Sequence, residues 1–135
     1  MKYLTAIAGV LLGLLFAFAS LAYFFKLVDM PPPPEGSPAA MFFGAFAPTG
    51  YLSFVKTCEL LGAVLIAIPA TRRLGLLVLG PIIINILAFH AFVARAGLFD
   101  PMIIVMVLLA LFLVWAERRA FAAYIRGGTA PAPAP

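Results

Sequence analysis

Four long apolar runs constrain this chain more than any other feature of its sequence. They cover residues 3–25, 51–68, 74–93 and 101–115, and each approaches the ~20 residues that a helix needs to cross the hydrocarbon core of a bilayer. Only helices and closed barrels satisfy their backbone hydrogen bonds in lipid, and a barrel strand would alternate polar and apolar residues. Because the runs do not alternate, the sequence predicts an all-α integral membrane protein, a four-helix transmembrane bundle.

The composition agrees with burial in lipid and excludes other classes of protein. Of the 135 residues, 65% are hydrophobic and only 10% are charged, and the mean hydropathy is +1.15. A soluble domain of this size needs a charged surface, which this chain lacks. The net charge of +4 comes from basic residues near the ends of the runs and not from a basic stripe. We therefore expect the lipid bilayer as a partner and no nucleic acid.

Few side chains are available for metal or redox chemistry. Cys58 is the single cysteine, which excludes an internal disulfide and a cysteine metal site, and a buried cysteine usually acts as a small apolar residue. His90 is the single histidine, which excludes bis-histidine haem; ligation with Met102 or Met106 is formally possible but disfavoured. We predict no metal, no covalently bound cofactor and no catalytic residue.

The positions of lysine and arginine predict the orientation of the chain. One side of the membrane receives Lys2, Arg72, Arg73, Arg118, Arg119 and Arg126. The other side holds only Lys26 and Arg95, together with three acidic residues. Since basic loops remain in the cytoplasm, both termini are predicted to be cytoplasmic. The first run imitates a signal peptide, but it continues through Phe25, so we expect it to be retained as a helix.

The chain is predicted to form one domain over residues 1–126, followed by a proline- and alanine-rich tail at residues 127–135. After the first run, four consecutive prolines at residues 31–34 favour polyproline II. The next stretch, "SPAAMFFGAFAPTG", offers Ser37 as a helix N-cap and Pro38 at the first helical position. We predict a short interfacial helix on the outer leaflet or over the bundle, with an ordinary packed loop as the alternative.

Polar residues are expected to gather in the outer half of the membrane. At a helical rise of ~1.5 Å per residue, Lys56 lies roughly 8 Å and Glu59 roughly 12 Å below the outer face, and Asn85 lies at a similar depth. A lone charge at such depth is costly, so Lys56 and Glu59, three residues apart, are predicted to pair inside the bundle. The candidate intramembrane polar site comprises Lys56, Glu59, Asn85, His90, Tyr23 and Lys26.

Two interpretations of this polar site remain open. It is a pocket that holds a quinone or lipid head group or relays protons, or it is an ion pair and an amide that fix the packing of the helices. His90 is about 140° round the helix from Asn85, so the two side chains need not point into the same site. A kink of the helix at Pro81 would change the angle between them. In the same run, Gly75 and Gly80 are expected to let helix backbones approach closely.

Several motifs of the chain resemble the DoxX-like family of small four-helix bacterial membrane proteins. They are "MPPPPEG", "APTGYLSFVKTCELLGAVLIAIP" and "LGLLVLGPIIINILAFHAF". The similarity extends over about residues 4–126. It implies that Lys56, Glu59, Pro81, Asn85 and His90 occupy positions of the family pattern. One stretch departs from the family pattern, because relatives often have "GLNKFF" where this chain has "SLAYFF". Tyr23 therefore stands where lysine is frequent, and Lys26, one turn later, would have to take the place of that lysine.

The resemblance implies a location and a kind of function. It suggests a multi-pass protein of the bacterial cytoplasmic (inner) membrane that works with other membrane subunits in a quinol- or thiosulfate-linked redox complex, without catalysing a reaction itself. The alternative is a purely structural accessory subunit at the periphery of a respiratory or photosynthetic complex. A small transporter or proton relay is a weaker alternative, because the sequence shows neither inverted repeats nor pairs of broken helices.

Overall fold

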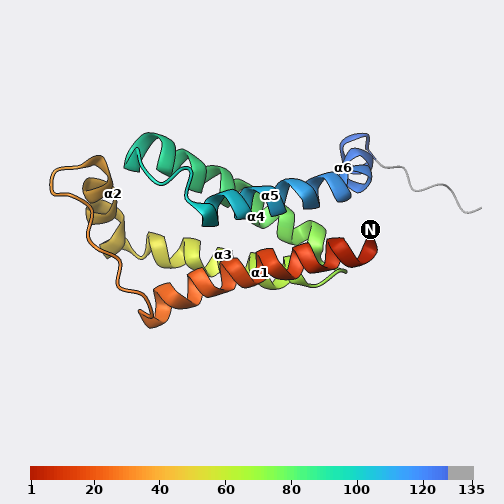
Figure 1. Ribbon diagram of the computed structural model, residues 1–135, viewed down its shortest axis with the longest axis horizontal. Helices are drawn as coiled ribbons and strands as arrows, with labels where there is room; N and C mark the ends of the chain where they lie inside the picture. Colours follow the sequence, from red (N-terminus) through yellow and green to blue (C-terminus); the bar gives the residue numbers. More distant parts are fainter. Residues whose placement is uncertain (128–135) are drawn as a thin grey trace, which may run out of the picture.

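The computed structural model describes residues 1–127, and within them it contains helices and no strand (Figure 1). The elements are α1 (Lys2–Phe25), α2 (Pro38–Phe46), the 3₁₀-helix η1 (Ala47–Thr49), α3 (Tyr51–Ala67), α4 (Arg72–Ala88), the π-helix η2 (Phe89–Ala94), α5 (Pro101–Ala116) and α6 (Arg118–Ile125). The all-α prediction is therefore confirmed for this part of the chain. The tail predicted at residues 127–135 lies, apart from its first residue, outside the described residues.

The helices differ in their capacity to cross a membrane. α1, and α4 continued by η2 (Arg72–Ala94), are long and apolar enough individually. The other two candidates are bent pairs, in which α2 and η1 meet α3 at 84° and α5 meets α6 at 63°. α3 has 17 residues and spans only ~25 Å at the helical rise, somewhat less than a typical hydrocarbon core. By length and composition, the described residues hold two to four candidate spans.

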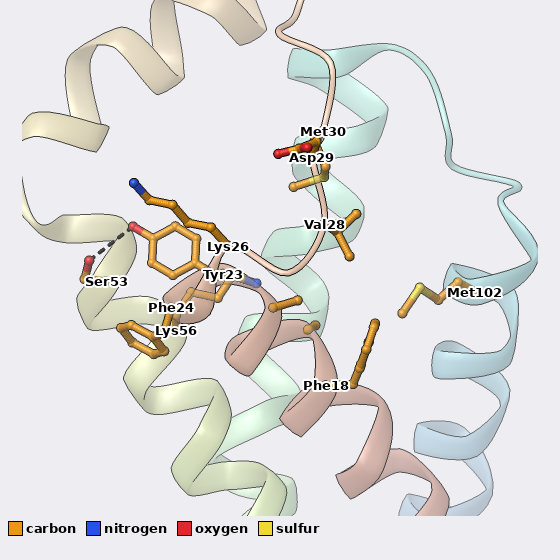
Figure 2. Close-up of a pocket in the computed structure, with 12 residues that line it drawn as sticks. Phe18, Tyr23, Phe24, Lys26, Val28, Asp29, Met30, Ser53, Lys56 and Met102 are labelled. Atoms are coloured by element: carbon orange, nitrogen blue, oxygen red, sulfur yellow. Dashed lines mark hydrogen bonds between the residues drawn. The ribbon is translucent and has the colours of Figure 1, made fainter.

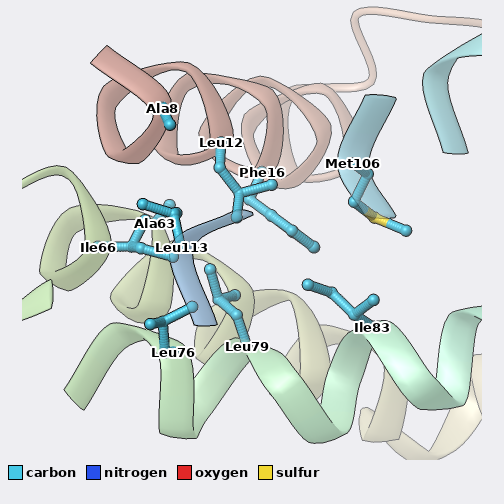
Figure 3. Packing of buried hydrophobic residues seen from close by; sticks show 10 residues of the cluster. All are labelled: Ala8, Leu12, Phe16, Ala63, Ile66, Leu76, Leu79, Ile83, Met106 and Leu113. Carbon is cyan, nitrogen blue, oxygen red and sulfur yellow. The ribbon is translucent and has the colours of Figure 1, made fainter. Parts of the chain in front are cut away.

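Four helices share one hydrophobic core (Figure 3). Leu12 of α1, Ile66 of α3, Leu79 of α4 and Leu113 of α5 are each fully buried. The outward faces of the same helices are also apolar; Leu14, for example, is 62% exposed. Exposure of such an apolar surface to water is unfavourable, whereas its exposure to lipid is not. The surface is therefore consistent with a membrane protein.

Glycines set the distances between three of these helices. A Cβ added to Gly13 of α1 would lie 2.7 Å from the carbonyl oxygen of Ala63, and one added to Gly75 of α4 would lie 2.5 Å from the backbone nitrogen of Ile66. The expectation for Gly75 is thus confirmed. The expectation for Gly80 is wrong, because nothing lies within 4 Å of the position its Cβ would take.

The predicted helix after the proline run is present as α2. The Ser37 side chain accepts a hydrogen bond from the backbone N–H of Ala40 at 3.2 Å, and Pro38 occupies the first turn. The rings of Phe42 and Phe43 then pack at steep angles against that of Phe89 in η2, with ring centroids 5.2 and 5.5 Å apart. α2 therefore packs over the end of α4 and its continuation η2, at the end of the molecule opposite the N-terminus (Figure 1).

Candidate functional site

A buried ion pair lies between α1 and α3. Lys56 Nζ donates to Glu59 Oε2 at 2.8 Å, one turn apart on α3. Ser20 of α1, which is fully buried, donates from its hydroxyl to the same oxygen at 3.4 Å. The Glu59 side chain is 4% exposed and that of Lys56 is 27% exposed. The carboxylate is therefore enclosed by the helices, while the ammonium group reaches their surface.

The exposed end of this pair opens on a cavity of about 720 Å³ (Figure 2). Its polar lining comes from the end of α1, the following loop and α3, and its apolar lining includes Phe18 and Met30. Figure 2 shows Tyr23, Lys26 and Lys56 at one side of the cavity and Met102 of α5 at the other. The polar lining residues are Tyr23, Lys26, Asp29, Ser53 and Lys56.

Tyr23 and Lys26 reach the cavity for different local reasons. The Tyr23 hydroxyl and the Ser53 hydroxyl share a hydrogen bond of 3.1 Å, which ties α1 to α3 above the ion pair. Lys26 is the residue after α1 and has the left-handed conformation, with φ of 50°. Its backbone N–H closes the helix on the carbonyl oxygen of Ala22. Because the chain turns there, the Lys26 side chain is placed at the cavity and not along the helix.

Asn85 and His90 do not join this group. Asn85 is exposed on α4, because it follows the buried Ile83 by two residues, which is about 200° round the helix. The fold therefore does not bring Asn85 to Lys56 and Glu59. α4 also continues through Pro81 into η2, where His90 is partly buried.

His90 lines a second, separate cavity of about 520 Å³, formed with the loop from Arg95 to Asp100. Its Nδ1–H donates to the carbonyl oxygen of Ile86 at 2.8 Å, so Nε2 is the free nitrogen. Gly97 packs beside the ring; a Cβ there would lie 3.2 Å from Cδ2. The six residues predicted as one polar site are thus divided into a cavity group, an exposed Asn85 and a separate His90.

The cavity group has the composition of a binding site. Lys56 supplies a cation and Tyr23 a hydroxyl at the wall of a largely apolar space, which is the usual composition of a site for a small amphiphile. Within residues 1–127, no cluster of three or more histidine, cysteine or acidic side chains could hold a metal ion. Cys58 is a free thiol on α3 and is partly buried.

A second cluster of charges lies at the end of the molecule that carries α6, and the sequence pattern does not predict it, because polar residues are expected to gather in the outer half of the membrane. Arg72 is 5% exposed, and its Nη1 lies 4.0 Å from Glu117 Oε1. Arg73 Nε donates to Glu117 Oε2 at 2.8 Å. The sequence predicts Arg72 as one of the basic residues at this side of the membrane, and the structure shows that it is buried against Gly9 of α1. One feature of the sequence indicates this cluster: Glu117 is the only acidic residue among the basic residues of that side.

Comparison with known proteins adds one relative. The uncharacterized protein YwoB of Bacillus subtilis (strain 168) is 38% identical to the chain over 76 residues. The match covers 56% of this chain and 48% of the relative, so the chain spans about half the length of that protein. No family model and no solved structure matches the chain. The class defined so far is an all-helical protein with two to four candidate membrane spans.

Proposed function

We propose that this chain is a four-helix, multi-pass protein of the bacterial cytoplasmic membrane and a small, non-catalytic subunit of a quinol- or thiosulfate-linked redox assembly. Its cavity between α1 and α3 holds the head group of a quinone or of another membrane lipid. The observation that carries this proposal is the partly exposed Lys56 ammonium at the cavity wall, backed by the buried Glu59 carboxylate.

The chemistry of the cavity supports a ligand that is apolar with one polar end. A quinone carbonyl needs a hydrogen-bond donor, and both the Lys56 ammonium and the Tyr23 hydroxyl lie at the cavity wall. The rest of the ligand needs apolar contacts, which Phe18, Val28 and Met102 supply. A volume of about 720 Å³ is ample for such a head group.

The membrane location and the redox context have separate support. The apolar outer surface and the candidate spans support insertion in a bilayer. The resemblance of the "FVKTCELLG" and "PIIINILAFH" stretches to DoxX-like proteins supports the redox assembly. The division of charges between the two ends supports a cytoplasmic position for the end that carries the N-terminus and α6.

The test is the quinone and subunit content of protein purified from native membranes in mild detergent. We expect wild-type protein to carry a quinone in a fixed ratio and to copurify with redox subunits. Glu59→Gln should lose most of both, because Lys56 is then left without its counter-charge. Thr57→Ala, which changes an exposed residue of the same helix, is the matched control. Wild-type quinone and subunit content in Glu59→Gln would contradict the proposal.

A purely structural accessory subunit is the second candidate. The observation in its favour is that Glu59 Oε2 accepts hydrogen bonds from two side chains of the protein itself, those of Lys56 and Ser20. The double substitution Lys56→Met with Glu59→Leu separates the two, because an ion pair that only supports packing is often replaced by apolar residues at little cost. A structural subunit keeps its partners in this variant, whereas a head-group site loses its quinone.

A further inference from the structure

One end of the molecule is strongly basic. α6 lies at the same end as the N-terminus (Figure 1), and the ion pairs of Glu117 bring the start of α4 there as well. This end therefore collects six of the nine basic side chains and one of the five acidic ones. The acidic residue is Glu117, and the basic ones are Lys2, Arg72, Arg73, Arg118, Arg119 and Arg126.

Within residues 1–127, the only acidic side chain at this end is already paired with arginines. Glu117 contacts both Arg72 and Arg73. Arg118 is directed back onto α5, where its guanidinium lies 4.3 Å from the centre of the Trp115 ring and donates to the Trp115 carbonyl oxygen at 2.6 Å. The two remaining arginines of this segment, Arg119 and Arg126, are exposed and form no ion pair within the described residues.

α6 presents these arginines in a form that fits a membrane surface. Arg119 lies in α6 and Arg126 is the residue that caps its end, seven residues further on, so the two lie on nearly the same side of the helix. Tyr124 and Ile125 are 69% and 87% exposed and are offset from the arginines. α6 is also bent by 63° from α5, so that an α5 close to the membrane normal leaves α6 close to the membrane plane. A basic side and exposed apolar residues in that plane are the features of an interfacial helix.

We infer that α6 binds the head groups of anionic phospholipids in the leaflet at this end of the molecule, through Arg119 and Arg126. The inference rests on the membrane topology proposed above and adds a lipid class to it. Anionic head groups complement an arginine pair that has no acidic partner in the described chain, and the exposed Ile125 contacts the acyl chains. A nucleic acid would use the arginines but would leave the Ile125 side chain in water.

Trp115 allows a direct test, because it is the only tryptophan of the chain and lies next to α6. The full chain is reconstituted in vesicles of equal parts phosphatidylglycerol and phosphatidylcholine, with bromine on the acyl chains of one lipid or the other. Bromine quenches tryptophan at short range. We expect brominated phosphatidylglycerol to quench at least about twofold more strongly, since each surface arginine favours an anionic lipid. Arg119→Gln with Arg126→Gln should abolish the difference.

The control is Arg95→Gln, which removes an exposed basic residue from the other end of the molecule and should leave the difference unchanged. Equal quenching by the two brominated lipids in the wild type would overturn the inference and leave the membrane topology standing. An unchanged lipid preference in the Arg119 and Arg126 double variant would also overturn it. Absence of quenching by either lipid would overturn both the inference and the membrane topology.

Discussion

Buried charge is the main feature of this protein at the scale of single residues. Glu59 and Arg72 are 3% and 5% exposed, and each has an opposite charge close by. Their situations differ, however. Glu59 receives two hydrogen bonds, whereas Nε and Nη2 of Arg72 are buried without a partner in the described residues. The stability of the Arg72 site therefore depends strongly on Glu117.

The first prediction concerns that dependence. Glu117→Gln should destabilise the protein by about 3 kcal/mol, because the buried Arg72 guanidinium loses its counter-charge. Arg73→Gln should cost less than about 1 kcal/mol, because the Arg73 side chain is 53% exposed and its pair with Glu117 lies at the surface. Unfolding in mixed detergent micelles, followed by circular dichroism, measures both. Equal losses in the two variants would show that Arg72 does not depend on Glu117.

At the scale of the helix, close contact between backbones decides which residues are tolerated. α1, α3 and α4 meet at glycines because a side chain would collide with the backbone of the neighbouring helix, as it would at Gly75 against Ile66. Lipid surrounds the outer faces in the proposed topology, so close packing between helices has to replace part of the hydrophobic driving force.

A matched pair of substitutions within α4 tests whether close contact between helix backbones requires glycine. Gly75→Ala should destabilise the protein by about 2–3 kcal/mol, because the new methyl group meets backbone atoms of Ile66 that cannot rotate away. Gly80→Ala should be neutral or should stabilise by up to about 1 kcal/mol, because its Cβ meets nothing within 4 Å and alanine favours the helix. The same detergent titration compares them. A similar loss for both would argue against close α3–α4 packing.

For the whole molecule, the separation of charge between its ends sets the expected orientation. The end with the N-terminus and α6 is basic (Figure 1), whereas the segments that follow α1, precede α2 and precede α5 carry Asp29, Glu35 and Asp100 with few basic residues. The positive-inside rule then places α6 in the cytoplasm and α2 outside.

Cysteine labelling in intact cells checks this orientation in a chain whose native thiol is removed by Cys58→Ala. A membrane-impermeant maleimide should label Glu35→Cys in intact cells, and Arg119→Cys only after the membrane is permeabilised. Denatured samples of both variants provide the control for reactivity. Labelling of Arg119→Cys in intact cells, with protection of Glu35→Cys, would show the opposite orientation.

Local signals predicted the helices well and the site only in part. Ser37 and Pro38 indicated α2, because capping depends on neighbouring residues. α6 was missed because its eight residues carry no long apolar run. Asn85 was expected beside Lys56 and Glu59 from its depth alone, but depth does not state the direction in which a side chain points, and Asn85 is exposed.

Sequence alone determined the helical class, the apolar outer surface and the pairing of Lys56 with Glu59, because each depends on spacing along one segment. The tertiary structure decided which residues from different helices meet. Only the rotation and crossing of the helices bring Ser20 to Glu59, Tyr23 to Ser53 and Glu117 to Arg72. The same packing separates His90 from the cavity at Lys56, because it places His90 on η2, beside the loop that leads to α5.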